Sequence, residues 1–198
     1  MKSVQPLGSV LQVGGRRYVV VGHRLVRDGD GVATGYLTVP YPLGFVGAES
    51  LQVLPASAVE AVVASAPDAT DGAPVLPVGS VVRLQGAEAL VMVAGYEPLL
   101  DSGWADYLGV PYPMGLVQED AAVAFDASAV DEVVQRGLWD SEAEAGLAAV
   151  RRFRAATSDT LRRVEELTAS LTPSRVDELR MQYSFDALDD DPEPDFPM

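Results

Sequence analysis

The 198-residue chain contains no cysteine, which excludes disulfide bonds, thiol nucleophiles and cysteine-ligated zinc. It contains a single histidine, His23, so it has no metal site with several imidazole ligands. Only 14 lysines and arginines stand against 29 aspartates and glutamates, and the formal net charge of −15 disfavours phosphate backbones and anionic membranes. No apolar run approaches the roughly 18 residues of a transmembrane helix, and the N-terminus lacks the apolar core of a secretion signal. We therefore expect a cytoplasmic protein that inserts into no membrane and binds no nucleic acid.

An internal repeat organises the sequence. Residues 6–63 align with residues 77–134 at a constant offset of 71 without a gap, and 21 of the 58 aligned positions are identical. The identities gather in three blocks, PLGSV against PVGSV, YLTVPYPLGFV against YLGVPYPMGLV, and ASAVEAVV against ASAVDEVV. This repeat predicts two copies of one fold.

Each copy has the pattern of an antiparallel β-meander followed by a short helix. Valine-rich runs separated by glycine predict strands joined by turns. The segment Pro-Tyr-Pro-x-Gly, at 40–44 and 111–115, predicts a rigid corner after the third strand. The valines that end each copy have helical spacing and predict a helix over each sheet: Val59, Val62 and Val63, and their equivalents Val130, Val133 and Val134.

The predicted fold class is α+β, with two tandem pseudo-symmetric small domains followed by amphipathic helices and a disordered acidic tail. The linker between the copies is rich in Ala, Pro and Asp, and beyond Trp139 apolar residues recur every three or four positions until Pro173. The predicted divisions are repeat 1 at 3–66, repeat 2 at 74–138, a C-terminal helical region at 139–183 and the tail at 184–198.

Motifs that would indicate catalysis, a metal or a nucleotide are missing from the sequence. His23 faces Ala94 in the repeat alignment, so it belongs to no duplicated site. Asp30 and Asp101 align, but they fall in glycine-rich loops without a second duplicated carboxylate. Neither a GxGxxG fingerprint nor a P-loop is present. We expect a protein that is not an enzyme and that has no cofactor and no metal.

Two features are candidate binding surfaces. Tyr41 and Tyr112 each stand between prolines, which suits presentation of an aromatic ring to a partner. The alternative is that each corner closes its sheet and packs its tyrosine inside. The second candidate is the distal part of the helical stripe, which is longer than a small β domain can cover: Leu161, Arg162, Arg163, Val164, Leu167 and Leu171. For its arginines the alternative is a solvated helix face.

The PxGSV opening, the Tyr-bearing strand into VPYPxG and the short Val-Val segment resemble the domain of unknown function family 4176, DUF4176, in each copy. The resemblance implies genes located in type VII secretion loci, near WXG-like small helical proteins and LXG-type toxins. Members of the family usually have one domain, whereas this chain carries two tandem copies and an arginine-bearing helix.

These observations support two functional hypotheses. The first is a non-catalytic adaptor or chaperone that binds a protein partner, either a type VII secretion substrate or its small helical partner proteins. The alternative is a module that senses a small molecule or peptide, with its ligand between the two repeats near Tyr41 and Tyr112.

Overall fold

Two antiparallel sheets and a long helix make up the described part of the chain. The computed structural model describes residues 4–28, 31–65, 75–118 and 121–170. The chain divides into two compact units, Met1–Arg154 and Ala155–Met198, and the first unit contains both sheets and the start of the helix. The predicted α+β class is confirmed.

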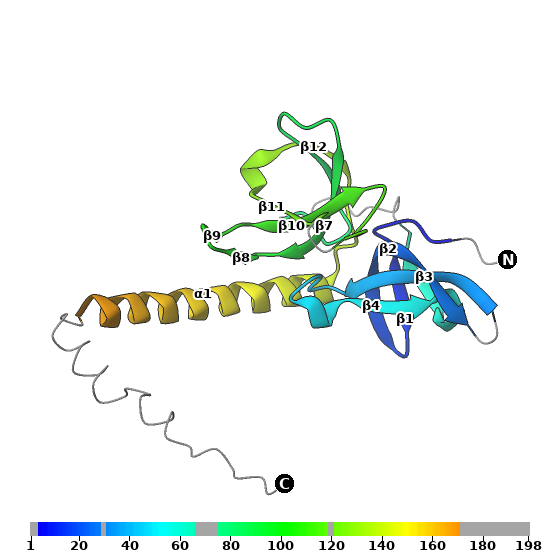
Figure 1. The fold of residues 1–198 in the computed structure, drawn as a ribbon, viewed down its shortest axis with the longest axis horizontal. Coiled ribbons are helices and arrows are strands. Elements are labelled where there is room, and N and C mark those ends of the chain that lie inside the picture. The colour runs from blue at the N-terminus through cyan, green and yellow to red at the C-terminus, as the bar shows by residue number, and fades with distance from the viewer. Residues whose placement is uncertain (1–3, 29–30, 66–74, 119–120, 171–198) are drawn as a thin grey trace, which may run out of the picture. The chain divides into compact units, whose positions relative to one another are not determined.

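The first sheet is antiparallel and has the strand order β4-β3-β2-β1-β5 (Figure 1, blue to cyan). Its strands are β1 (Val10–Val13), β2 (Arg16–Asp28), β3 (Gly31–Pro40), β4 (Gln52–Pro55) and β5 (Ala61–Ala64). Between β1 and β2, Gly14 and Gly15 have φ angles of +57° and +72°. Two residues with positive φ form the tight turn that matches the twist of a hairpin, so the glycines explain this connection.

The second sheet repeats this order as β11-β10-β7-β6-β12 (Figure 1, green). Its strands are β6 (Val81–Leu84), β7 (Leu90–Tyr96), β10 (Tyr107–Tyr112), β11 (Val123–Phe125) and β12 (Val130–Gln135). A separate small hairpin, β8 (Leu99–Leu100) with β9 (Gly103–Trp104), lies between β7 and β10 in the sequence. The repeated order confirms the predicted antiparallel meander in both copies.

The constant offset of 71 between the copies is wrong in the second strand. Val10 pairs with Val19, whereas its equivalent Val81 pairs with Met92, so β2 and β7 correspond at an offset of 73. The β6–β7 turn is two residues longer than the glycine turn of the first repeat. The connection from β7 to β10 is two residues shorter than the connection from β2 to β3, because the pair Tyr96–Tyr107 corresponds to His23–Tyr36. Few identities anchor the gapless alignment between these turns, and it therefore missed the shift.

The helix predicted at the end of each copy is also wrong. Each copy has a single 3-10 turn there, η2 (Ala56–Ala58) or η4 (Ala127–Ala129), and then a strand, β5 or β12, that pairs with the first strand of its sheet. β-Branched valine favours an extended backbone, and the first strand offers unpaired hydrogen-bonding groups along its free edge. Val62 and Val63 are 40% and 41% exposed, so they form no buried helical face.

The two repeats contact each other through equivalent groups. Each Pro-Tyr-Pro corner reaches the second strand of the other copy: the Phe45 N–H donates to the Ala94 carbonyl at 2.7 Å, and the Leu116 N–H donates to the Val21 carbonyl at 2.8 Å. Gly8 faces its own equivalent, Gly79, and a Cβ added at Gly8 would lie 2.8 Å from the Gly79 carbonyl oxygen. Reciprocal contacts of this kind define an isologous interface. The buried side chains of both repeats belong to one continuous core.

Helix α1 (Ser141–Ser170) follows the second repeat and confirms the helix predicted beyond Trp139. Its first turns bury Ala143 and Leu147. Among the helices in the described part of the chain, none is both long enough and apolar enough to cross a membrane. The second helix predicted around 175–183 and the tail at 184–198 lie outside the described residues.

Candidate functional site

The Pro-Tyr-Pro corner of the first repeat holds the beginning of α1. Tyr41 is 6% exposed, and its hydroxyl donates a 2.8 Å hydrogen bond to Oδ1 of Asp140, the residue before the helix. The Arg17 guanidinium lies 4.6 Å from the centroid of the Tyr41 ring, which is within cation–π range. A Cβ at Gly146 would lie 2.5 Å from Cγ of Pro42, so the helix approaches the corner this closely only because residue 146 has no side chain.

Asp140 is the centre of a polar cluster, here called the Asp140 clasp, that consists of Arg17, Tyr41, Asp140 and Glu142. Its Oδ2 accepts a 2.7 Å hydrogen bond from Nη1 of Arg17, which also pairs with Glu142. Its Oδ1 accepts from the backbone N–H groups of Glu142 at 3.1 Å and Ala143 at 3.0 Å. Asp140 therefore caps α1 and ties the cap to the first repeat.

The clasp keeps Asp140 charged and Tyr41 neutral. Burial acts to raise the pKa of Asp140, but the hydrogen bonds from Arg17, the Ala143 N–H and the Tyr41 hydroxyl outweigh it and hold the pKa below its usual range. Burial raises the pKa of Tyr41 above its usual range, and the hydrogen bond to Asp140 raises it further. The Asp140 carboxylate is already engaged with four donors. Its arrangement suits positioning of the helix rather than proton transfer.

The corner of the second repeat is more open. Tyr112 is half-buried, and the next two residues, Pro113 and Met114, are exposed, Met114 by 69%. The equivalent of Arg17 is Leu90, which pairs with Tyr112 across β7 and β10. A clasp based on arginine is thus formed at the first corner alone. That Tyr41 or Tyr112 binds a partner stays a prediction, and the contacts of Tyr41 described above are with the chain's own residues.

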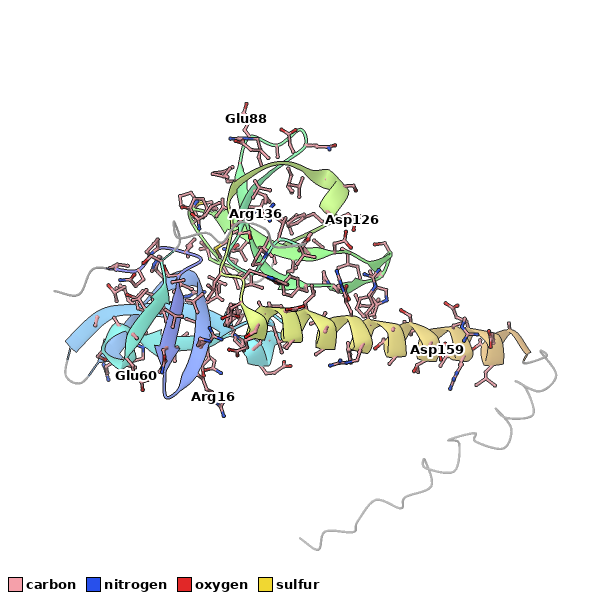
Figure 2. The ribbon with its side chains drawn as sticks, turned by 180° about the vertical axis from the view of Figure 1, so that it is seen from behind. Arg16, Glu60, Glu88, Asp126, Arg136 and Asp159 are labelled. Carbon is pink, nitrogen blue, oxygen red and sulfur yellow. The ribbon has the colours of Figure 1, made fainter. Side chains whose placement is uncertain are left out.

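The predicted helical surface lies on α1 in the second compact unit. Leu161, Val164 and Leu167 are 43%, 53% and 66% exposed. Arg162 pairs with Asp159 at 2.6 Å, and Arg163 pairs with the same carboxylate at 3.1 Å; Figure 2 labels Asp159 on this part of the helix. Arg162 also pairs with Glu166 at 2.8 Å. Leu171, the last residue of the predicted surface, lies outside the described residues.

His23 has a local structural role. It is exposed on β2, its Nε2 lies 2.8 Å from the Gln5 carbonyl oxygen, and its ring meets Tyr36 edge-on at 5.9 Å between centroids. Within the described ranges, no group of three or more His, Asp or Glu side chains is arranged to hold a metal ion.

Two features of the structure were missed at the level of sequence. One is the Asp140 clasp, although an aspartate followed by Glu142 at the start of an apolar period is a recognisable helix start. Its connection to Tyr41, 99 residues away, has no sequence signal. The other is an apolar cavity between the repeats, which neither Tyr41 nor Tyr112 lines.

Residues 75–145 match the family model for a domain of unknown function (DUF4176). The matched segment covers the second repeat from before β6 through the first turn of α1, and the first repeat is not matched. No curated protein and no solved structure matches the chain.

Proposed function

We propose that the protein is a non-catalytic adaptor or chaperone that binds a helical segment of a protein partner. The observation that carries this proposal is the exposed apolar face of α1 in the second compact unit, formed by Leu161, Val164 and Leu167. At 3.6 residues per turn these residues fall on one side of the helix. Helices in proteins gain most of their stability by packing such a face against another element, and a partner helix packs along it by the same spacing.

The first Tyr-Pro corner supports a helix as the partner element. In this chain that corner already binds a helix, because Tyr41 and Pro42 contact the first turns of α1. The second corner presents Pro113 and Met114 exposed at the equivalent positions. The second corner is therefore an additional surface that a partner helix would use.

A partner from a type VII secretion system is proposed from the family. The match of residues 75–145 is to a domain of unknown function and names no partner. The genomic company of such domains supports a secreted substrate of the LXG type or a WXG-like small helical protein, bound in the cytoplasm before export. The first repeat shares its strand order with the matched segment, which supports two tandem copies of this domain.

The test is a double variant, Leu161→Asp with Leu167→Asp, assayed by circular dichroism and by pull-down with co-expressed small helical proteins encoded beside the gene. Its control, Ala155→Asp with Ala169→Asp, adds the same charge to exposed positions on the other side of α1. We expect the first variant to stay folded and lose binding, and the control to bind as wild type. Equal binding by both variants excludes the α1 face. Loss of binding in Met114→Asp then places the partner on the second corner instead.

The alternative function, a ligand site between the repeats, is favoured by one observation, the apolar cavity at their interface. It differs from the predicted site because the two tyrosines stand outside the cavity lining.

A further inference from the structure

A cavity of about 140 Å³ lies between the two sheets of the first compact unit. Both repeats contribute to its wall, and every lining side chain is apolar. The lining residues are Val21, Val39, Phe45, Ala48, Leu51, Ala94, Leu108, Val110, Leu116 and Ala122. Val39 and Val110, which are equivalent in the two repeats, are 0% and 2% exposed, so the inner wall is sealed from solvent. Ala48, which also lines the cavity, is exposed.

The cavity arises because the repeats differ in side-chain size. The second repeat has Ala122 where the first has Leu51, and it has Ala94 where the first, at the offset of β2, has Val21. Both alanines line the cavity, as do the larger residues to which they correspond. Protein interiors are normally packed without voids of this size, so the missing carbons leave space that nothing in the described chain fills.

The walls of the cavity cannot close over this space without breaking the contact between the repeats. Its lining includes the residues of the reciprocal backbone hydrogen bonds, Phe45 to Ala94 at 2.7 Å and Leu116 to Val21 at 2.8 Å. These bonds fix the distance between the two sheets at the edge of the cavity. The space is therefore preformed, which lowers the cost of admitting a ligand.

We propose that this cavity binds a small uncharged apolar molecule, a single aromatic ring or a short branched alkyl group. An apolar cavity of about 150 Å³ lined by similar side chains stays dry and accepts benzene, so the size and lining suit that class. Charged or strongly polar molecules are excluded, because the wall offers no side chain to replace their hydrogen bonds with water. This ligand site goes beyond the adaptor function and involves no residue of the α1 face.

Toluene is the probe for this proposal, and methyl-labelled protein reports where it binds. We expect toluene to raise the melting temperature of the full chain and to shift the methyl signals of Val39, Val110 and Leu116. Ala122→Leu, which restores the residue of the first repeat, should weaken toluene binding at least tenfold. Its control, Ala148→Leu at an exposed position on α1, should bind toluene as wild type does.

Two results overturn the proposal. One is a melting temperature and a methyl spectrum that toluene leaves unchanged; the other is equal toluene affinity in wild type and Ala122→Leu. If Ala122→Leu fails to fold, Ala94→Val fills the same cavity with the residue of the first repeat and is judged by the same measurements. Neither result bears on the α1 double variant, so failure of the ligand site and failure of the adaptor function are distinguished.

Discussion

Asp140→Ala is the most informative single change, because one carboxylate caps α1 and also binds the first repeat. The substitution removes the acceptor for the N–H groups of Glu142 and Ala143, for the Tyr41 hydroxyl and for one arm of Arg17. Asp140→Asn is its matched partner. Asparagine still caps a helix and still accepts from Tyr41, but it carries no charge for Arg17.

The expected magnitude is the sum of three effects. Loss of the N-cap costs about 1 kcal/mol. The buried Tyr41 hydroxyl left without its charged acceptor costs about 1–3 kcal/mol. The side chains of Arg17 and Asp140 are 22% and 32% exposed, and Arg17 keeps Glu142, so this pair adds at most about 1 kcal/mol. We expect Asp140→Ala to lower the free energy of unfolding by about 3 kcal/mol, and Asp140→Asn to lower it by about 1 kcal/mol.

Urea unfolding followed by tryptophan fluorescence measures both variants, and Trp139 stands immediately before the substituted residue. A double-mutant cycle with Tyr41→Phe should give a coupling energy of about 1 kcal/mol or more. Asp131→Ala, at an exposed carboxylate on β12, is the control and should cost less than about 0.5 kcal/mol. A cost for Asp140→Ala as small as that of the control, or a coupling energy near zero, would refute the clasp.

The folded pKa of Asp140 lies below its unfolded value. The difference in free energy of unfolding between wild type and Asp140→Asn should therefore be full above about pH 4 and disappear as the pH falls further through the folded pKa. A difference that persists in strong acid contradicts this assignment. Gly44→Ala should cost about 3 kcal/mol, because Gly44 has φ +73° and its Cβ would lie 2.2 Å from the Ala94 carbonyl oxygen. Gly86→Ala has the same φ of +73° with nothing within 4 Å, so equal costs for the two variants in urea unfolding would show that the contact between repeats is not formed. Ala122→Leu should raise the free energy of unfolding by about 1 kcal/mol, and a loss of stability would show that the cavity has no room for the added carbons.

The repeated blocks explain how much of the fold was predictable. The glycine turn after Val13 and the Pro-Tyr-Pro corners are local signals, because their backbone geometry depends on the residues themselves. The valines around Val62 satisfy both the helical and the strand pattern over so short a stretch. The choice between them came from the free edge of β1, which is far away in the sequence.

The binding surfaces were predictable to different degrees. The apolar period of α1 identified an exposed face, because helical spacing alone places Leu161 and Val164 together. The clasp between Arg17 and Asp140 joins residues 123 positions apart, and only the packing of the two repeats brings them together. The cavity could not be predicted from the gapless alignment. Ala94 is recognised as the small counterpart of Val21 only when β2 and β7 are aligned at the offset of 73.

The reciprocal contact between the repeats also has a consequence for assembly. In a chain with one such repeat, the same glycine approach and the same pair of backbone hydrogen bonds would have to form between two molecules, and the complex would dissociate on dilution. Here both halves are on one polypeptide, so each meets the other at an effective concentration fixed by the connecting segment. Pairing of the halves is then independent of how much protein the cell makes. The two partners are also free to become different, as Arg17 and Leu90 already are, so that one face of an otherwise symmetric pair accepts α1 and the other stays open.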